Sequence, residues 1–442
     1  MFKRDLYLNR LIESQNNKLI KVITGIRRCG KSFLLNNIFY DYLIKDRKID
    51  PKYIIRFAFD NESDIMKLDS YFPKKATTKK VRGQDLVDSR KFLSFIEEQI
   101  KEDGFYYLLL DEIQNLENFV RVLNSFLYRD NFDVYVTGSN SRFLSSEVDT
   151  EFGGRGYRIH LLPLSFNEYC SFTSSDKRDA LNEYIRYGGI PLVQLQPNDT
   201  SKVNQAISIV KETYFKDLEL RHPTADKNNL EETLRVIASM ISTPINPTRI
   251  ENTFKSKYRL NIVNDSIKEY IKWFEEAYLL NKVLRFDIKG RGYIGTPYKI
   301  YFEDIGIRNA ILNFRDIDET DLIENIVYNE LRYRGFNVDV GTIKFSTKSD
   351  KLDKNNKQIY IKNDAEVDFI ASKGSKIYYI QVALEINNEE KKEQEYRPLR
   401  NINNSFKKVI IVKNDSKAFY TSEGFLRINL LDFLADINSL DL

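Results

Sequence analysis

The sequence predicts an α/β fold in which helices cover both faces of a mainly parallel sheet. Two observations carry this prediction. Largely apolar segments of strand length alternate with segments of helical period, and the strand-like segments are residues 19–23, 53–59, 105–110 and 133–137. These strands read as almost continuously apolar, which is typical of parallel sheets because both faces of such sheets are buried.

Length and composition limit the classes that the chain can join. At 442 residues it is too long for one compact core, so we expect several domains. A net charge of +4 with two cysteines gives neither a strong polyanion-binding field nor a disulfide framework, and two histidines make a zinc site improbable. The charged start and the lack of an apolar run of membrane-spanning length favour a cytoplasmic protein with no membrane partner.

Residues 25–32, with the sequence GIRRCGKS, form a complete phosphate-binding loop between a predicted strand and a predicted helix, residues 33–45. Glycines let the backbone wrap phosphates, and the helix that follows directs its N–H groups at them. Lys31 is expected to reach the β- and γ-phosphates, and Ser32 is expected to hold Mg²⁺. The nucleotide-binding residues we expect are Gly25, Ile26, Arg27, Arg28, Cys29, Gly30, Lys31, Ser32 and Phe33. The alternative is a glycine-containing turn that matches by chance.

Two carboxylates, Asp111 and Glu112, end the apolar strand 105–110 after the helix predicted at 89–100. Asp111 can hold the Mg²⁺ water shell, and Glu112 can polarise an attacking water. An acidic turn after a strand is common by itself. Together with the phosphate loop, the pair predicts hydrolysis of a nucleoside triphosphate by water.

Two further candidates follow the helix predicted at 118–128. Asn140, with Ser139 second, follows the strand 133–137 and would lie beside the γ-phosphate if that strand lies between the two motif strands. The alternative is an ordinary polar turn. Arg155, in a glycine-rich segment, suits the role of an arginine finger supplied to a neighbouring subunit, or else it is a solvated surface residue.

The motifs resemble, in order, those of prokaryotic AAA+ ATP-binding proteins whose C-terminal domain is catalogued as domain of unknown function 4143. The resemblance spans nearly the whole chain and rests on residues 25–32, 108–112, 137–140, 154–155, 162–168 and 187–191. It implies an additional-strand ATPase fold, ATP and Mg²⁺ as ligands, and a helical lid that begins near residue 164. It also implies the roles given above for Asn140 and Arg155.

The middle of the chain, from about residue 229, reads as three helices followed by a hairpin. This order is a winged-helix layout, and the resemblance points the same way. Four basic residues, Lys268, Lys272, Lys289 and Arg291, could meet DNA phosphates. Glu269, Glu275 and Glu276 on the same helix oppose that role, so a surface that contacts protein stays an equal alternative.

From about residue 316 the order of elements resembles the restriction-endonuclease-like fold. The residues that match its metal site are Glu330, Asp368 and Gln381, but Ala383 stands where that fold has a catalytic lysine. Without this cation, ordinary nuclease chemistry is doubtful and a degenerate binding domain is favoured.

Two lysine-rich stretches complete the pattern: Lys74, Lys75, Lys79, Lys80 and Arg82, and the residues from 344 to 362. Both read as loops or insertions. They could follow a phosphate backbone, although such runs are more often simply solvated.

The predicted organisation is therefore a P-loop AAA+ core at 1–163, a helical lid at 164–228, a winged-helix segment at 229–315 and a restriction-endonuclease-like α/β domain at 316–442. The function it predicts is an ATP-hydrolysing homo-oligomer that acts on or near DNA or another nucleic acid. The alternatives are a nucleotide-dependent switch that binds a protein partner and a nucleotide-gated nuclease.

Overall fold

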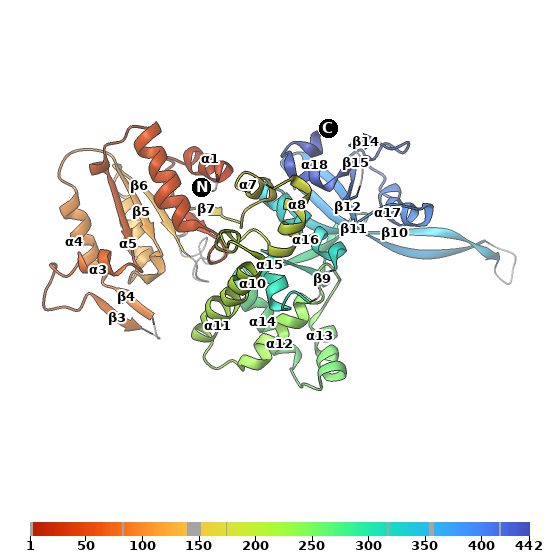
Figure 1. Ribbon diagram of the computed structural model, residues 1–442, viewed down its shortest axis with the longest axis horizontal. Helices are drawn as coiled ribbons and strands as arrows, with labels where there is room; N and C mark the ends of the chain where they lie inside the picture. Colours follow the sequence, from red (N-terminus) through yellow and green to blue (C-terminus); the bar gives the residue numbers. More distant parts are fainter. Residues whose placement is uncertain are drawn as a thin grey trace. The chain divides into compact units, whose positions relative to one another are not determined.

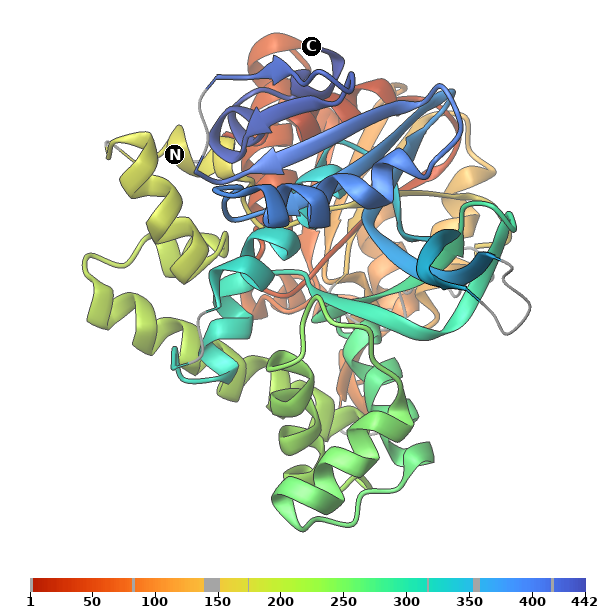
Figure 2. The same ribbon diagram turned by 90° about the vertical axis from the view of Figure 1, so that its right-hand side faces the viewer.

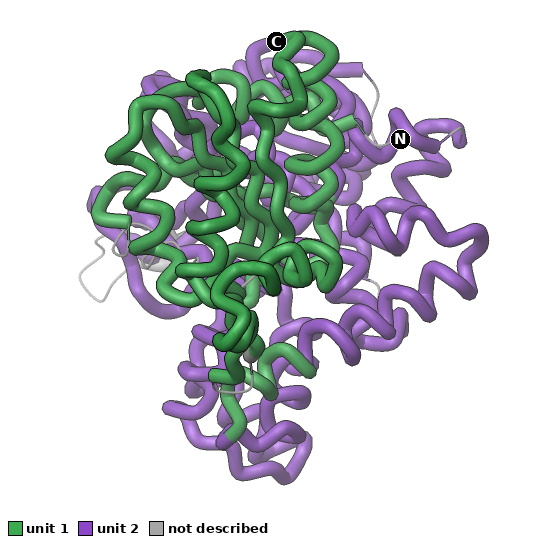
Figure 3. The backbone as a smooth tube through the Cα atoms, turned by 90° about the vertical axis from the view of Figure 1, so that its left-hand side faces the viewer, with its two compact units in different colours: residues 1–163, 216–223, 276–278 green, residues 164–215, 224–275, 279–442 purple. Residues whose placement is uncertain are grey.

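The computed structural model describes residues 3–81, 84–138, 152–173, 175–315, 318–352, 358–414 and 417–442. The chain divides into two compact units (Figure 3). Unit 1 comprises Met1–Pro163, Lys216–Pro223 and Glu276–Tyr278, and unit 2 comprises Leu164–Phe215, Thr224–Glu275 and Leu279–Leu442. The four finer domain boundaries stay a prediction.

Unit 1 is built on the predicted parallel sheet. Its five strands lie in the order β2-β5-β6-β1-β7. They are β1 (Ile20–Thr24), β2 (Ile54–Ala58), β5 (Tyr106–Asp111), β6 (Phe132–Thr137) and β7 (Gly156–His160). Because β6 pairs with both β1 and β5, it separates the strand that leads into the phosphate loop from the strand that ends in Asp111. The ends of all three strands therefore meet at one edge of the sheet.

The other elements of unit 1 are helices and two short strands, several of which flank this sheet in Figure 1. They are α1 (Asp5–Glu13), α2 (Lys31–Phe33) with its continuations η1 (Leu34–Phe39) and η2 (Tyr42–Asp46), η3 (Pro51–Tyr53), α3 (Glu62–Met66), β3 (Thr78–Val81), β4 (Gln84–Val87), α4 (Ser89–Gln99), η4 (Ile113–Asn115), α5 (Phe119–Leu127) and α11 (Lys216–Arg221). Phenylalanines fix one face of the sheet: the ring of Phe59 lies 4.7 Å from Phe57 and 4.9 Å from Phe92 on α4, measured between centroids. Such aromatic pairs contribute packing beyond their buried area.

Unit 2 contains a mixed sheet of eight strands in the order β14-β15-β13-β12-β11-β10-β8-β9. The strands are β8 (Leu280–Asp287), β9 (Gly292–Phe302), β10 (Asn337–Leu352), β11 (Gln358–Lys373), β12 (Lys376–Ala383), β13 (Lys407–Val412), β14 (Phe419–Tyr420) and β15 (Leu426–Asn429). The hairpin expected as a separate wing, β8 with β9, is thus an edge of the same sheet, since β8 pairs in parallel with β10 through Val340–Thr342. The expected boundary at residue 315 crosses this sheet.

Helices occupy the rest of unit 2. They are α7 (Phe166–Cys170), α8 (Lys177–Tyr187), α9 (Pro191–Gln194), α10 (Asp199–Ser208), η6 (Ile209–Phe215), α12 (Lys227–Ala238), α13 (Pro247–Thr253), η7 (Phe254–Tyr258), α14 (Asn264–Glu276), α15 (Ile305–Ile311), α16 (Glu319–Tyr333), α17 (Glu389–Arg400), α18 (Leu430–Ala435) and η8 (Ser439–Asp441). Figure 2 shows the green helices α12 to α14 grouped at one end of this unit and the blue strands at the other. Within the described parts of the chain, no helix is both long and apolar enough to cross a membrane.

The lysine-rich stretches differ from the loops expected for them. Residues 344–352 and 358–362 lie in β10 and β11, which pair with each other, and Lys79 and Lys80 lie in β3, which pairs with β4. Lysine spacing gives no strand period, so the sequence pattern missed these strands.

The Tyr187–Pro191 motif has a packing role in unit 2. Gly188 has a φ of +71°, and the backbone N–H of Gly189 donates to the Asp304 carboxylate at 2.6 Å. The same carboxylate caps α15 by accepting from the N–H of Ile307 at 2.9 Å. Burial raises the pKa of Asp304 to about 6, against the lowering effect of these N–H groups. Gly188 lets the chain approach α15 closely, and Gly189 lets it approach the backbone of Leu164.

Gly189→Ala is expected to destabilise unit 2 by roughly 1–3 kcal/mol, because the added Cβ would lie 2.2 Å from the carbonyl oxygen of Leu164. Gly295→Ala is the matched control, since its Cβ would meet nothing within 4 Å. Thermal melting of both variants tests this account. Equal midpoints for the two variants would show that the close approach at Gly189 is unimportant.

Candidate functional site

The phosphate loop depends on two glycines in the left-handed region. Gly25 has a φ of +142° and Gly30 a φ of +100°, conformations that side chains disfavour. A Cβ on Gly25 would also lie 2.2 Å from the carbonyl oxygen of Leu161. The loop begins where β1 ends at Thr24, and the helix begins at Lys31. The predicted strand-loop-helix context is therefore present.

Lys31 lies inside the loop. Its side chain is buried, and its Nζ donates to the carbonyl oxygens of Gly25 and Ile26, each at 3.0 Å. The loop backbone thus holds the ammonium group at the centre of the turn. A phosphate bound there would meet a cation that is already positioned.

Asp111 collects hydrogen bonds from three elements. Its carboxylate accepts from the Ser32 hydroxyl at 3.0 Å, from the Asn36 amide at 3.3 Å, and from the Thr137 hydroxyl. Thr137 ends β6, and its Oγ1 also accepts from the backbone N–H of Glu112 at 3.0 Å. The structure therefore brings Ser32 and Asp111 together, as the proposed metal site requires.

Several carboxylates lie close together at this edge of the unit 1 sheet, and the pKa values of Asp111 and Asp60 are raised. Burial raises the pKa of Asp111, and hydrogen bonds from Thr137 and Ser32 oppose the rise. Burial and the nearby Glu112 also raise the pKa of Asp60, which follows β2. Glu112 itself has a φ of +50°, uncommon for a non-glycine residue, and its carboxylate accepts from the Gln114 amide. The sequence analysis missed Asp60 and Thr137, although each follows or ends a predicted strand.

An ion-pair cluster on α11, also missed, lies against the loop. Arg27 of the loop pairs with Asp217 at 2.8 Å, and Asp217 pairs with Arg221 one helical turn later. Burial raises the pKa of Asp217, Arg221 and Arg27 lower it, and Glu112 raises it further. The one signal available from sequence was the Asp217 and Arg221 spacing of four residues, which marks a common helix pair.

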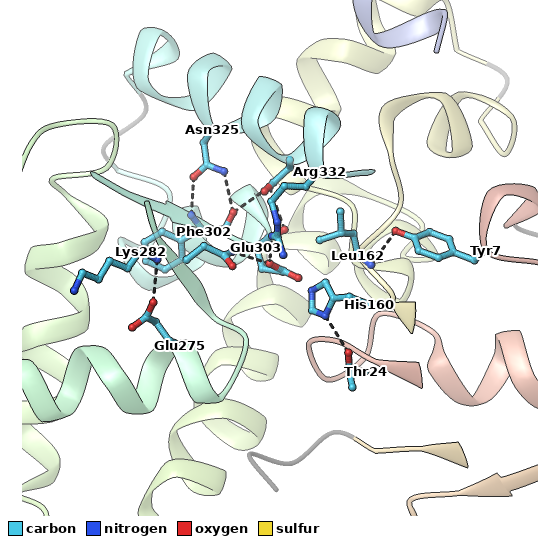
Figure 4. A network of polar contacts seen from close by, with 12 residues as sticks. Tyr7, Thr24, His160, Leu162, Glu275, Lys282, Phe302, Glu303, Asn325 and Arg332 are labelled. Atoms are coloured by element: carbon cyan, nitrogen blue, oxygen red, sulfur yellow. Dashed lines mark hydrogen bonds and ion pairs between the residues drawn. The ribbon is translucent and has the colours of Figure 1, made fainter. Parts of the chain in front are cut away.

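A second group of contacts braces the loop from β7 and α1 (Figure 4). The ring Nδ1 of His160 lies 3.2 Å from the Thr24 hydroxyl, and the Leu162 N–H donates to the Tyr7 hydroxyl at 3.1 Å. These contacts agree with a structural role for His160.

The remaining predicted catalytic residues lie elsewhere or outside the described part. Asn140 and Ser139 are not among the described residues. Arg155 is exposed and directly precedes β7, where Gly156 pairs with Ile20, the first residue of β1. The phosphate loop follows the last residue of β1, so the length of a five-residue strand, about 16 Å, separates the two ends. Arg155 therefore cannot serve the site of its own chain without a large movement.

The second predicted site, in unit 2, is only partly assembled. The Gln381 amide oxygen accepts from the Asp368 N–H at 3.0 Å, so these two residues lie together. Glu330 does not join them: its carboxylate pairs with Arg334 at 2.8 Å, and burial raises its pKa to about 7. Glu324, six residues earlier on α16, stands nearer to Asp368 and helps to raise the pKa of that residue.

A lysine from another strand occupies the centre of this group. Lys299 of β9 is 2 % exposed, and its ammonium group lies 2.9 Å from Glu324 and 2.7 Å from Glu366. The Tyr301 hydroxyl also donates to Glu324 at 2.5 Å. The adjacent carboxylates raise the pKa of Lys299 even though burial lowers it. Lys299 therefore stays protonated.

This cluster does not fit the metal site that the restriction-endonuclease-like fold implies. The ammonium of Lys299 already neutralises the carboxylates that a divalent ion would use. In the described ranges of the chain, no group of three or more His, Cys, Asp or Glu residues is arranged to hold a metal ion. The structure thus places a lysine from β9, instead of one at position 383, near Asp368, and the loss of nuclease chemistry stays a prediction.

Comparisons with known proteins place the phosphate loop in a named domain. Residues 17–170 match the family model described as AAA domain, and residues 178–318 match a domain of unknown function, DUF8612. The identity of the C-terminal part as domain of unknown function 4143 is not confirmed. An uncharacterized protein of Haemophilus influenzae is 31% identical over 417 residues, 93% of each chain.

Two further likenesses are weaker. An uncharacterized protein of Methanocaldococcus jannaschii is 26% identical and covers 97% of this chain and 89% of its own. The structure of the Aeropyrum pernix ORC2 protein matches 63% of this chain and 84% of its own with 16% identity and a TM-score of 0.34, which is too low to support an argument.

Lys299→Met is expected to destabilise unit 2 by about 3–5 kcal/mol at pH 8, since it leaves buried carboxylates without their cation. The loss is expected to be smaller at pH 5. Buried acids whose folded pKa lies above the unfolded value stabilise the fold at low pH, and this stability is lost as the pH rises through the folded pKa. Melting midpoints at both pH values measure the effect, with the exposed Lys268→Met as control. A wild-type midpoint at pH 8 would contradict the role given to Lys299.

Proposed function

Because the chain belongs to the same family as the uncharacterized Haemophilus influenzae protein and carries an AAA domain, we propose that it binds ATP with Mg²⁺ and hydrolyses the nucleotide to ADP and phosphate. The observation that carries this proposal is the pair of hydroxyls on Asp111. Ser32 from the phosphate loop and Thr137 from the intervening strand converge on one carboxylate.

The donor set at this point suits Mg²⁺. A carboxylate and a hydroxyl are hard oxygen ligands, and Mg²⁺ in nucleotide sites is usually held by one or two protein groups together with substrate phosphates. Ser32 would bind the ion and Asp111 would hold its water shell. When bound, the ion would neutralise charge on the transferring phosphoryl group.

The other residues around this point are proposed to have separate roles in nucleotide binding and hydrolysis. Lys31, already held by the Gly25 and Ile26 carbonyls, would neutralise phosphate charge. Glu112 would orient the attacking water, with Gln114 fixing its carboxylate. Asn140 is proposed to sense the γ-phosphate.

Arg155 is proposed to complete the site of a neighbouring subunit. Its place at the start of β7, away from its own phosphate loop, supports action between copies of the chain. The residue lines a surface depression with Asn118, Arg121, Asn124 and Tyr128 of the α5 region. A guanidinium from a second subunit would couple hydrolysis to assembly, so we propose a homo-oligomer.

We propose that the cycle acts on or near DNA, and a specific observation keeps a protein partner as the second candidate. On α14, Lys268 pairs with Asp265 at 3.0 Å, and Glu269 is exposed on the same helix. Such mixed charge suits a protein contact as well as it suits a phosphate backbone. The nuclease alternative stays the third candidate, although in the described part of the chain no group of three or more His, Cys, Asp or Glu residues is arranged to hold a metal ion.

Glu112→Gln is expected to bind ATP as the wild type does and to lower the hydrolysis rate by at least about a hundredfold, because the amide cannot accept a proton from water. Glu117→Gln, five residues later, is the control and should hydrolyse ATP normally. Equilibrium binding of a fluorescent nucleotide and phosphate release measure the two effects. Unchanged turnover in Glu112→Gln would contradict the catalytic role proposed for Glu112.

Arg155→Ala is expected to abolish a rise in specific ATPase activity with protein concentration, since the guanidinium acts on a second subunit. The wild type should show that rise in the micromolar range or below. Arg158→Ala, an exposed arginine on the adjacent strand, is the control. A wild-type activity that is independent of concentration, or a normal rise in Arg155→Ala, would argue against a shared site.

A further inference from the structure

The ribbon formed by β10 and β11 extends beyond the rest of the unit 2 sheet. β10 pairs with β8 only through Val340–Thr342, and β11 pairs with β12 only through Phe369–Lys373. Beyond these contacts the two strands pair with each other, and Figure 1 shows the pale-blue ribbon leaving the sheet. The ten residues from 343 to 352 correspond to a ribbon of about 33 Å. We call this two-stranded segment the arm.

The base of the arm is packed and the outer part is not. Ile343 is fully buried, and Phe345 lies under the guanidinium of Arg397 on α17, 5.9 Å from the ring centroid. Farther out, Ser346, Thr347 and Lys348 are exposed, as is Tyr360 on the facing strand at 58 %. A two-stranded ribbon without a core of its own gains little stability by itself, so the outer arm depends on the packing at its base.

The arm lysines whose side chains the structure describes lie on one face. In the antiparallel register Lys344 faces Asp364, Ser346 faces Lys362, and Lys348 faces Tyr360. Directly paired residues point to the same side of a sheet, so these six side chains share a face. The opposite face carries the uncharged pairs Phe345 with Asn363 and Thr347 with Ile361. Lysines placed only to keep an edge soluble would not need this segregation.

The lysines of this face are available for a partner. No ion pair joins Lys344, Lys348 or Lys362 to any residue in the described ranges. Among the pairs from Lys344 to Lys348, whose side chains the structure describes, Asp364 is the carboxylate on this face. Residues 343–365 contain six lysines and three aspartates, a net +3, whereas the whole chain carries +4. This segment is therefore one of two strongly basic stretches of the chain, the other being residues 74–82.

We propose that the arm is a β-ribbon that lies in the major groove of duplex DNA and binds its phosphate backbone. The major groove, about 12 Å wide, admits a two-stranded ribbon. Lys344 and Lys348 are four residues apart, about 13 Å along the strand, and Lys362 lies between them. A duplex carries about eight phosphates over that length, so each ammonium group can meet one. The face lacks the apolar side chains that insertion into a membrane requires.

This inference rests on the DNA part of the proposed function and specifies the surface that makes the contact. It leaves ATP hydrolysis independent, because the arm belongs to unit 2 and the phosphate loop to unit 1. It also predicts binding with little sequence preference, since lysine contacts to phosphates carry no base information.

The test is fluorescence anisotropy with a labelled 30-base-pair duplex of mixed sequence, at 50 to 300 mM NaCl. The arm variant is Lys344→Gln, Lys348→Gln and Lys362→Gln combined. Its affinity at 100 mM NaCl should fall at least tenfold, and the slope of log affinity against log salt should decrease in magnitude by about 2–3, since each phosphate contact contributes about 0.9. Phosphate release by the same variant should equal that of the wild type, which shows that unit 1 is folded, and its thermal melting midpoint should match that of the wild type, which shows that unit 2 is folded.

Two further variants separate the arm from other surfaces. Lys177→Gln, Lys211→Gln and Lys257→Gln remove the same charge from exposed lysines elsewhere in unit 2 and should change the affinity less than threefold. Lys272→Gln, Lys289→Gln and Arg291→Gln test the rival surface on α14 and the β8–β9 turn.

The outcomes distinguish failure of the arm inference from failure of the proposed DNA function. If the wild type binds duplex DNA and the arm variant binds it equally well with the same salt slope, the arm inference is overturned and the DNA function stands. If the wild type binds no duplex at 50 mM NaCl, both fail while ATP hydrolysis stays testable. A tenfold preference of the wild type for single-stranded DNA or RNA would also overturn placement in a duplex groove.

Discussion

The position of β6 between β1 and β5 is the constraint on which the candidate site depends. This order brings the last residue of β6, Thr137, against Asp111, the last residue of β5, while Ser32 reaches the same carboxylate from the loop after β1. Parallel pairing then places all three groups at the same edge of the sheet. Hydrogen bonds of this kind, made to a buried carboxylate, fix geometry because leaving the acceptor unsatisfied is costly. The site is therefore assembled by the fold itself.

The same parallel arrangement separates Arg155 from the phosphate loop, which is the reason for proposing that this residue acts on a neighbouring subunit. It also leaves room at the loop for α11, whose Asp217 joins Arg27 to Arg221. The segment that carries α11, Lys216–Pro223, belongs to unit 1, although the chain on either side of it belongs to unit 2.

Sequence patterns predicted most of the ATPase fold, because local features encode it. The strand of residues 133–137, the glycine loop and the Asp111 and Glu112 pair each carry a short-range signal, and the parallel sheet is confirmed. Groups joined by long-range packing were harder to predict. Lys299 stands 67 residues before Glu366, and no spacing rule links them. Glu330 has the helix position that the restriction-endonuclease-like metal site requires, yet its carboxylate pairs with Arg334 instead of joining Asp368 and Gln381. The sequence of the arm predicts a loop, because lysines interrupt the alternation of apolar and polar residues that marks a strand.

The measurement that tests the account most directly is the dependence of ATP affinity on Mg²⁺, determined by calorimetric titration for the wild type and for Asp111→Asn. The account predicts that Mg²⁺ tightens ATP binding to the wild type and that this gain is largely lost in Asp111→Asn, while affinity without Mg²⁺ changes little. Lys31, which meets the phosphates directly, stays intact in this variant. An equal gain from Mg²⁺ in both proteins would contradict the central claim that Asp111, held by Ser32 and Thr137, organises the nucleotide site.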